Sequence, residues 1–247
     1  MTELGEVQVT AKVIKNARLR GSTTSIDAED LLSKGAVTLP DSLQREPGVS
    51  VPLDIAGVDS LVPYLEGGSN SINIRGLEGN RVQVLVDGIA QPDDFVVRSF
   101  QGSGGPGRIY FDPAVFSSLD LLRTASPGSG SLAGTVAGQA ESPFTLLGDS
   151  LIGKALSSTS TYSSNNRSWN ERLSGAWGNG DLASSIVYSY RQGHELENNS
   201  DIPANPTDAE SHAVVWKTVI RNRSLTVTPT IDIFRSKAFT DLDSIET

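Results

Sequence analysis

Hydrophobic and polar residues alternate along the chain from about residue 150 onward. Leu182 and Ile186 share one face of a predicted strand with two tyrosines, whereas small residues and Arg191 share the other face. A period of two residues is typical of an extended strand whose two faces lie in different environments. Turn sequences such as Asn179-Gly180 separate neighbouring segments. The pattern therefore predicts long antiparallel strands joined by turns.

Two tryptophans lie near the ends of one of these predicted strands. Trp169 and Trp177 share a face and lie roughly 26 Å apart, at about 3.3 Å per residue. The apolar band of an outer-membrane barrel is about 25 Å tall and carries aromatic residues at both interfaces. Strands of about 9 to 12 residues also favour a barrel. A soluble β-sandwich alternates in the same way, so it stays open as the alternative.

The first half of the chain has shorter elements. Residues 73–89 are predicted to form two short strands around a turn at Gly79-Asn80, followed by a second turn at Asp87-Gly88. In the second strand, three valines alternate with Gln83 and Leu85, which predicts one buried face. These valines are Val82, Val84 and Val86.

Helix signals flank this segment. Residues 25–46 are predicted to be helical in two pieces, the first capped by Ser25 or Asp27. Asp112-Pro113 has the sequence of a cap followed by a first helical position, and a strand is predicted after it at residues 119–122. Around residue 140 the pattern changes to that of the long strands.

Composition narrows the class of protein. The chain has 247 residues, a formal net charge of −9, two histidines and no cysteine. The acidic balance argues against nucleic acid as a partner, and the lack of cysteine excludes disulfides and thiolate metal sites. No run of about 18 apolar residues is present, which excludes a membrane-spanning helix but not a barrel. No catalytic set is visible, so we expect no enzyme activity and no cofactor.

The N-terminal segment is short and prone to extended structure. Residues 6–11 read Glu-Val-Gln-Val-Thr-Ala, and a basic stretch follows at residues 12–20. One interpretation is a frayed terminal strand. The other is a peptide that adds as a strand to the sheet edge of another protein. The first residues have no apolar signal-peptide core.

Four motifs together resemble those of TonB-dependent outer-membrane receptors. The pair Ile74-Arg75-Gly76 and Val84-Leu85-Val86-Asp87-Gly88 carries the most specific resemblance. The closing motif is looser, because Thr124 stands where the family usually has glycine. The other segments are residues 6–11, similar to a TonB box, residues 39–51, similar to a plug motif, and Leu121-Leu122-Arg123 with residues 131–138, similar to the closing plug motif.

The resemblance implies an α+β plug domain, a small mixed sheet with short helices, followed by antiparallel strands of an outer-membrane β-barrel. We expect a TonB box and tether at residues 1–20, a plug at 21–142 and the first barrel strands at 143–247. The family's barrel has roughly 22 strands, and only about five fit here. The barrel is therefore expected to be incomplete in this chain, as in a fragment, a truncated product or one piece of a nicked receptor.

The implied function is energy-coupled import of an iron-containing ligand, either haem or a haemoprotein or a ferric siderophore. The expected partners are this ligand, TonB with its inner-membrane energising complex, and the lipid of the outer membrane of a Gram-negative bacterium. Nucleic acid is not expected. A non-transporting β-rich outer-membrane binding or adhesion protein is the alternative.

The resemblance also assigns roles to residues. Arg75 and Arg123 match plug arginines that pair with barrel carboxylates, whose positions we expect beyond residue 247. The plug has no histidine, so a haem ligand there would be Tyr64 or Tyr110. The TonB-binding residues are Glu6, Val7, Gln8, Val9, Thr10 and Ala11. From loop position, the candidate ligand contacts are Tyr64, Phe95, Arg98, Phe100 and Arg108.

Overall fold

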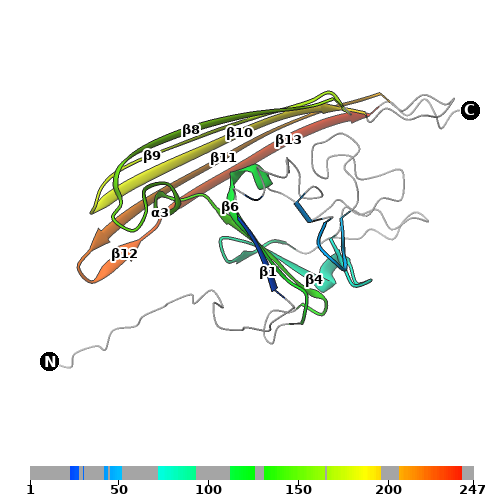
Figure 1. Ribbon diagram of the computed structural model, residues 1–247, viewed down its shortest axis with the longest axis horizontal. Helices are drawn as coiled ribbons and strands as arrows, with labels where there is room; N and C mark the ends of the chain where they lie inside the picture. The colour runs from blue at the N-terminus through cyan, green and yellow to red at the C-terminus, as the bar shows by residue number, and fades with distance from the viewer. Residues whose placement is uncertain are drawn as a thin grey trace, which may run out of the picture.

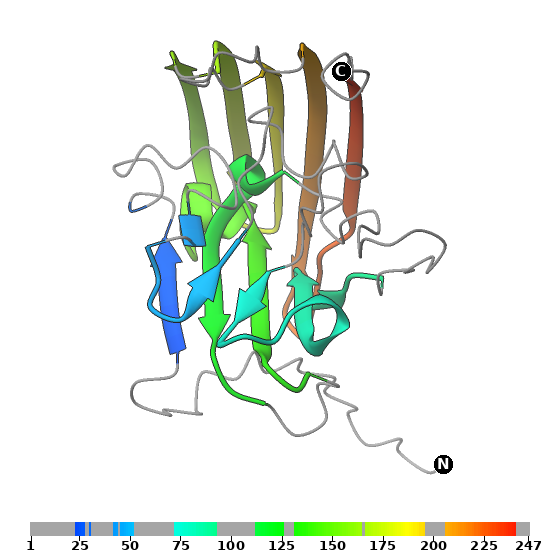
Figure 2. The same ribbon diagram turned by 90° about the vertical axis from the view of Figure 1, so that its right-hand side faces the viewer.

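Two large sheets of different character, with one small two-stranded sheet, make up the described part of the chain, and one large sheet lies against a face of the other (Figures 1 and 2). The first has short strands from the N-terminal half of the chain, and the second has long strands from the C-terminal half. We call them the N-terminal sheet and the long-strand sheet. The computed structural model describes residues 23–27, 30, 42–43, 45–51, 72–92, 112–125, 131–164, 166–195 and 206–240.

The N-terminal sheet is mixed and has the order β1-β6-β7-β4-β5. β4 and β7 pair in parallel, whereas the other neighbours pair antiparallel. The predicted alternation in β4 is confirmed, since its three valines are buried. The strands are β1 (Thr23–Asp27), β4 (Val82–Val86), β5 (Ile89–Ala90), β6 (Phe116–Leu122) and β7 (Gly134–Ala140).

Within residues 73–89, the prediction that two strands pair around a turn at Gly79-Asn80 is wrong. β3 (Asn73–Ile74) pairs with β2 (Val49–Ser50) in a separate small sheet, and β4 pairs with β5 and β7. A 3₁₀ turn, η1 (Gly79–Arg81), lies between β3 and β4. The carbonyl of Arg81 accepts the N–H groups of Leu132 and Ala133 at 3.0 and 2.9 Å, which holds the start of β4 beside the segment that leads into β7.

The predicted turn at Asp87-Gly88 is present and joins β4 to β5. Both residues have positive φ, 51° and 81°, and they are the two loop residues between the paired Val86 and Ile89. Such two-residue hairpin loops need a left-handed backbone, which Asp and Gly tolerate. The Asp87 N–H donates to Gly138 O at 2.9 Å, so β7 also fixes this turn.

Of the two residues predicted to cap the first helix, Asp27 is confirmed and Ser25 is not. Ser25 is not a cap, because it lies inside β1 and pairs with Asp120 of β6. Pairing with β6 buries Ile26 in the core, which outweighs the local helix signal. Asp27 does act as a cap: its carboxylate accepts the N–H of Asp30 at 2.8 Å.

The long-strand sheet is an antiparallel meander, as the alternation predicts. Its order is β12-β11-β10-β9-β8, and β13 pairs with β11 beyond β12. One end carries short turns and helix α3 (Pro143–Leu147), and we call the opposite end the loop end. The strands are β8 (Ile152–Ser163), β9 (Ser168–Asn179), β10 (Leu182–His194), β11 (Thr207–Asn222), β12 (Leu225–Val227) and β13 (Thr230–Thr240).

The two faces of the long strands differ sharply in exposure. On the inner face, toward the N-terminal sheet, Ala183, Val187 and Val215 are buried. On the outer face, large apolar side chains are exposed. Among the described residues, no helix is long and apolar enough to cross a membrane. The exposed outer-face side chains include Leu156, Trp169, Leu173, Trp177, Ile186, Trp216, Ile220, Ile231 and Ile233.

One hydrophobic core joins the two sheets. Leu121 and Val136 of the N-terminal sheet belong to the same buried cluster as Val187 and Val215 of the long strands. Where β7 passes β6, the ring of Phe116 occupies the space beside Gly138, so a Cβ there would meet it at 2.3 Å. Because the two sheets share this buried cluster, the N-terminal sheet packs directly on the inner face of the long strands.

Candidate functional site

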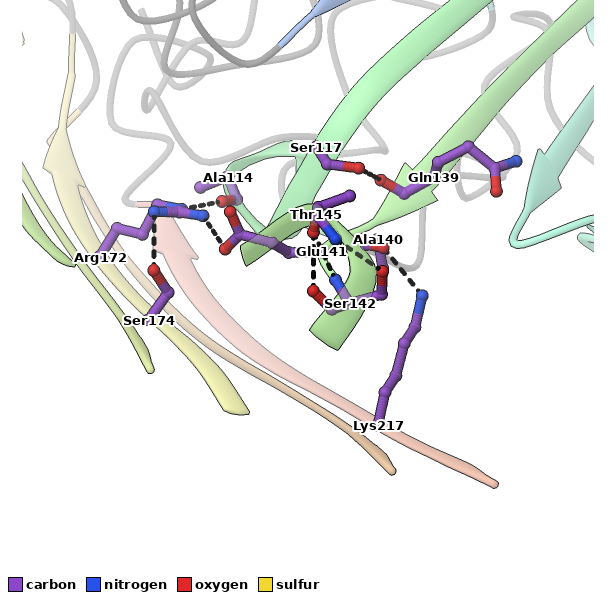
Figure 3. Close-up of polar contacts among 10 residues, drawn as sticks. All are labelled: Ala114, Ser117, Gln139, Ala140, Glu141, Ser142, Thr145, Arg172, Ser174 and Lys217. Atoms are coloured by element: carbon purple, nitrogen blue, oxygen red, sulfur yellow. Dashed lines mark hydrogen bonds and ion pairs between the residues drawn. The ribbon is translucent and has the colours of Figure 1, made fainter. Parts of the chain in front are cut away.

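The interface between the two sheets contains charged side chains as well as apolar ones. Three of the cations on the inner face pair with carboxylates, and they come from three adjacent strands: Arg172 of β9, Arg191 of β10 and Lys217 of β11. We call them the inner-face cations. Each binds a carboxylate of the N-terminal half, and two of them appear in Figure 3.

Arg191 makes the most deeply buried of these ion pairs. Its Nη2 lies 3.0 Å from Asp112 Oδ1, and the two side chains are 3% and 1% exposed. Asp112 also caps the 3₁₀ helix η2 (Pro113–Val115), as predicted, by accepting the N–H of Ala114 at 2.9 Å. Its second oxygen accepts the hydroxyl of Ser189 at 2.8 Å. The carboxylate is thus held by both halves of the chain.

Arg172 contacts the same region from the neighbouring strand. Its Nη2 pairs with the Glu141 carboxylate, and its Nε donates to Ala114 O at 2.7 Å (Figure 3). The N–H of Glu141 donates to Val115 O at 2.9 Å. Arg172 therefore connects η2 and the segment after β7 to the inner face of β9.

Lys217 holds the far edge of the N-terminal sheet. Its Nζ donates to Asp87 Oδ1 and to Ala140 O, both at 2.8 Å. The same Asp87 oxygen accepts the N–H of Ala140 at 3.0 Å. Because Asp87 lies in the β4–β5 turn, one ammonium group binds that turn and the end of β7 together.

A fourth inner-face side chain secures the segment that leads into the long strands. Arg221 donates from Nη1 to Asp149 O at 2.9 Å, and its guanidinium lies 5.4 Å from the centre of the Phe144 ring. Phe144 belongs to α3, which begins with a capping box between Ser142 and Thr145 (Figure 3). The short helix is thereby fixed against the inner face.

These contacts favour one defined position of the N-terminal half on the inner face. Buried charges lose hydration, so such pairs add little net stability compared with apolar packing. Removing one partner is costly, about 3–5 kcal/mol, because the other charge is left buried. The pairs therefore specify one position of the N-terminal half on the inner face strongly while adding little net stability of their own.

A second group of charged residues lies at the loop end, which we call the rim cluster: Arg167, His194, Glu195 and Asp208. Glu195 pairs with Arg167 and accepts the N–H of Thr207 at 2.9 Å. His194 Nδ1 lies 2.8 Å from Asp208 Oδ1. The hydrogen bond from the Thr207 backbone lowers the pKa of the Glu195 carboxyl below its ordinary value of 4.5.

The predicted latch arginines lie in the N-terminal half. Arg123 is buried and pairs with Glu46 of the same half. Arg75 is exposed, with φ 54°, and its N–H donates to Gly48 O at 2.8 Å. Neither observation tests a partner beyond residue 247, so their latch role stays a prediction. The expected TonB-binding segment 6–11 lies outside the described residues, as do Tyr64, Phe95, Arg98, Phe100, Arg108 and Tyr110.

The observed interface pairs have the opposite polarity to the predicted latch, with cations on the long strands and carboxylates on the N-terminal half. A signal for the cations is present in the sequence, because Arg191 and Lys217 fall on the face of small residues. The carboxylates lie in a turn, a cap and a connection, where an acidic residue has an ordinary local role. Within the described part of the chain, no group of three or more metal-ligating side chains could hold an ion.

Comparison with known proteins places the first half of the chain. Residues 15–135 match the family described as the TonB-dependent Receptor Plug Domain. The transferrin-binding protein A of Haemophilus influenzae is 27% identical over 213 residues, covering 81% of this chain and 22% of that protein. The heme/hemopexin utilization protein C of the same organism is 31% identical over 126 residues, covering 48% and 14%.

Solved structures extend the similarity to the long strands. The FrpB iron transporter from Neisseria meningitidis (F3-3 variant) superposes with a TM-score of 0.68 at 14% identity. The match covers 87% of this chain and 32% of that one, so both sheets share its fold. The chain thus spans about a fifth or less of the two curated relatives.

Proposed function

The chain belongs to the TonB-dependent outer-membrane receptors, and we propose that it forms the plug and first barrel strands of a receptor that imports an iron-containing ligand. The observation that carries this proposal is a plug-family match at residues 15–135, followed by strands whose outer face is apolar. We propose the domain limits expected from the sequence: tether to 20, plug at 21–142 and barrel strands from 143.

In this proposal the inner-face cations seat the plug in the barrel. Ligand binds on the loop-end side, and the N-terminal segment then becomes available to TonB. TonB adds a strand to residues 6–11 and pulls, using inner-membrane energy, and the plug moves. Arg75 and Arg123 belong to the same seating system through barrel carboxylates.

The proposed ligand contains iron that is bound by a carrier molecule. The names of two relatives point to transferrin and to haem with hemopexin, and one structural neighbour is an iron transporter. These names support an iron-containing ligand, whether the iron is carried by haem, by a protein or by a siderophore. Tyr64, Phe95, Arg98, Phe100 and Arg108 are the proposed plug contacts.

A non-transporting binding or adhesion protein is the second candidate. It would share the apolar outer face and would bind ligand without energised movement of the plug. The two proposals differ in whether residues 6–11 matter for anything beyond binding.

Deletion of residues 1–12 from the receptor distinguishes them. Cells are supplied with radioactive iron on transferrin, in haem or on a ferric siderophore, and binding at 0 °C is separated from energised uptake. The transporter proposal predicts that uptake is lost and binding is kept. Uptake that continues at the wild-type rate would contradict it and favour the binding protein. Substitution of Lys15 and Lys12 by Gln in the tether provides a control with the segment intact.

A further inference from the structure

Lys217 has a second carboxylate within its reach, and this one belongs to the barrel. In β13, Asp232 pairs in register with Val215 of β11, two residues from Lys217. Opposite residues in an antiparallel pair project from the same face, and a diagonal neighbour lies about 7–8 Å away, within reach of a long side chain. Val215 is buried against the plug, so Asp232 is on the inner face as well. It interacts electrostatically with both Lys217 and Asp87.

In the seated structure Lys217 binds the plug instead of Asp232. Its hydrogen bonds go to Asp87 and Ala140, and the Asp232 side chain is exposed. An exposed carboxylate therefore lies beside a buried cation that is already paired with another domain.

For Arg191 and Arg172, the opposite positions on the neighbouring long strands carry no acidic residue. Arg191 pairs across the sheet with Ser211 and Asn170, and Arg172 with Ser189 and Thr159. None of these barrel neighbours is acidic. The arrangement around Lys217 is thus particular to the edge of the plug that contains the Asp87 turn.

We propose that Lys217 exchanges partners when the plug moves, leaving Asp87 of the plug for Asp232 of the barrel wall. This inference rests on the proposed function, since it assumes that the plug is displaced. The exchange keeps the ammonium paired as Asp87 departs, so the barrier to release at this edge is lowered. When Asp87 returns, its carboxylate, which accepts the Ala140 N–H, and Ala140 O together bind Lys217 again.

Charge balance explains why Asp232 matters more for release than for seating. In the seated state Asp232 attracts Lys217 and repels Asp87, and these effects oppose each other. As the plug leaves, the repulsion disappears and the attraction stays. Removing the Asp232 charge should therefore slow release while changing the seated structure little.

The test pulls on the plug by an N-terminal handle in single receptors held in a lipid bilayer. With Asp232→Asn, the lifetime of the seated plug at constant force should lengthen about fivefold, the change expected for loss of one partly exposed ion pair. With Asp87→Asn it should shorten. Asp232→Glu should restore the wild-type lifetime.

The matched control is Asp181→Asn, the same change at an exposed position in the β9–β10 turn. In a Lys217→Gln background, Asp232→Asn should have no further effect. A wild-type or shorter lifetime for Asp232→Asn, or an effect that persists without Lys217, would overturn the exchange. The measurement uses neither ligand nor TonB, so a receptor that fails the uptake test can still pass or fail this one.

Discussion

The two faces of the long strands use the same backbone for opposite purposes. On the outer face Trp169, Trp177 and Trp216 are 42–49% exposed, whereas on the inner face Arg191 is 3% exposed. A water-soluble sheet would bury the tryptophans and expose the arginine. The inversion is the one expected if the outer face meets lipid, and on the inner face packing and directed ion pairs hold the plug.

The two faces should also differ in how many substitutions they tolerate. Under this account the outer face needs only to be apolar, because fluid lipid accommodates apolar side chains of different shapes. The inner face must match a folded domain atom by atom, as the three hydrogen bonds to Asp112 illustrate. Substitutions chosen by face should therefore have different consequences.

The largest effect is expected from Asp112→Asn. The amide oxygen still accepts the Ala114 N–H, so the cap survives, but Arg191 loses the negative charge of its buried partner Asp112. We expect a loss of about 3–5 kcal/mol in the free energy of unfolding, measured by denaturant titration of the receptor in detergent.

A second change should recover much of that loss. Arg191→Met combined with Asp112→Asn removes the buried guanidinium charge together with its carboxylate partner. Arg223→Gln, in an exposed turn, is the control for loss of an arginine. If the double variant is no more stable than Asp112→Asn, the buried guanidinium charge is not the cause.

On the outer face, Leu173→Arg places a charge midway between Trp169 and Trp177. We expect a loss of about 2–4 kcal/mol when the receptor folds into lipid vesicles. Ser224→Arg, in an exposed turn, should have little effect. Equal folding of both variants would mean that this face does not meet the hydrocarbon core.

Two glycines of β9, one on each face, allow the faces to be compared by adding a single methyl group through Gly→Ala. A Cβ on the inner-face Gly178 would meet Leu151 O at 2.2 Å, whereas one on the outer-face Gly175 meets nothing closer than 3.7 Å. Gly178→Ala should cost about 1–3 kcal/mol and Gly175→Ala less than about 0.5 kcal/mol in thermal or denaturant unfolding. Equal costs would contradict the contrast in packing.

The smallest effect concerns the rim cluster and depends on pH. Because the folded-state pKa of Glu195 is lowered, its contribution is complete above the ordinary value of 4.5 and is lost as pH falls through the folded value. Glu195→Gln should therefore lose less stability than the parent receptor on acidification from about pH 7 to about pH 3. Parallel unfolding curves against pH for the two proteins would exclude this role of Glu195.

Local patterns in the sequence predict the strands well and their partners poorly. The alternation of Val82, Val84 and Val86 identifies β4, and the longer alternations identify the barrel strands with their outer faces. The partner of β4 is β7, which begins at Gly134, and no short-range signal carries that pairing. The hairpin error and the missed β1 have this same origin, since both depend on contacts distant in the sequence.

The ion pairs between the inner-face cations and the plug are likewise only half visible in the sequence. A cation on a small-residue face, as at Lys217, is visible in the alternation. Its partner is set by where the β4–β5 turn comes to lie, 130 residues away in the sequence. Asp87 and Asp112 also have sufficient local reasons to be acidic, so their second role emerges only from the packing of plug on barrel.

The claim on which the whole account depends is that the outer face meets lipid while the inner face holds the plug. All three tryptophans of the chain lie on the outer face, so quenching of tryptophan fluorescence by bilayers of brominated lipid tests it directly. The contribution of each is the difference between the receptor and its Trp169→Phe, Trp177→Phe or Trp216→Phe variant. We predict that all three are quenched; tryptophans that stay unquenched by brominated lipid yet are quenched by aqueous iodide would contradict the account.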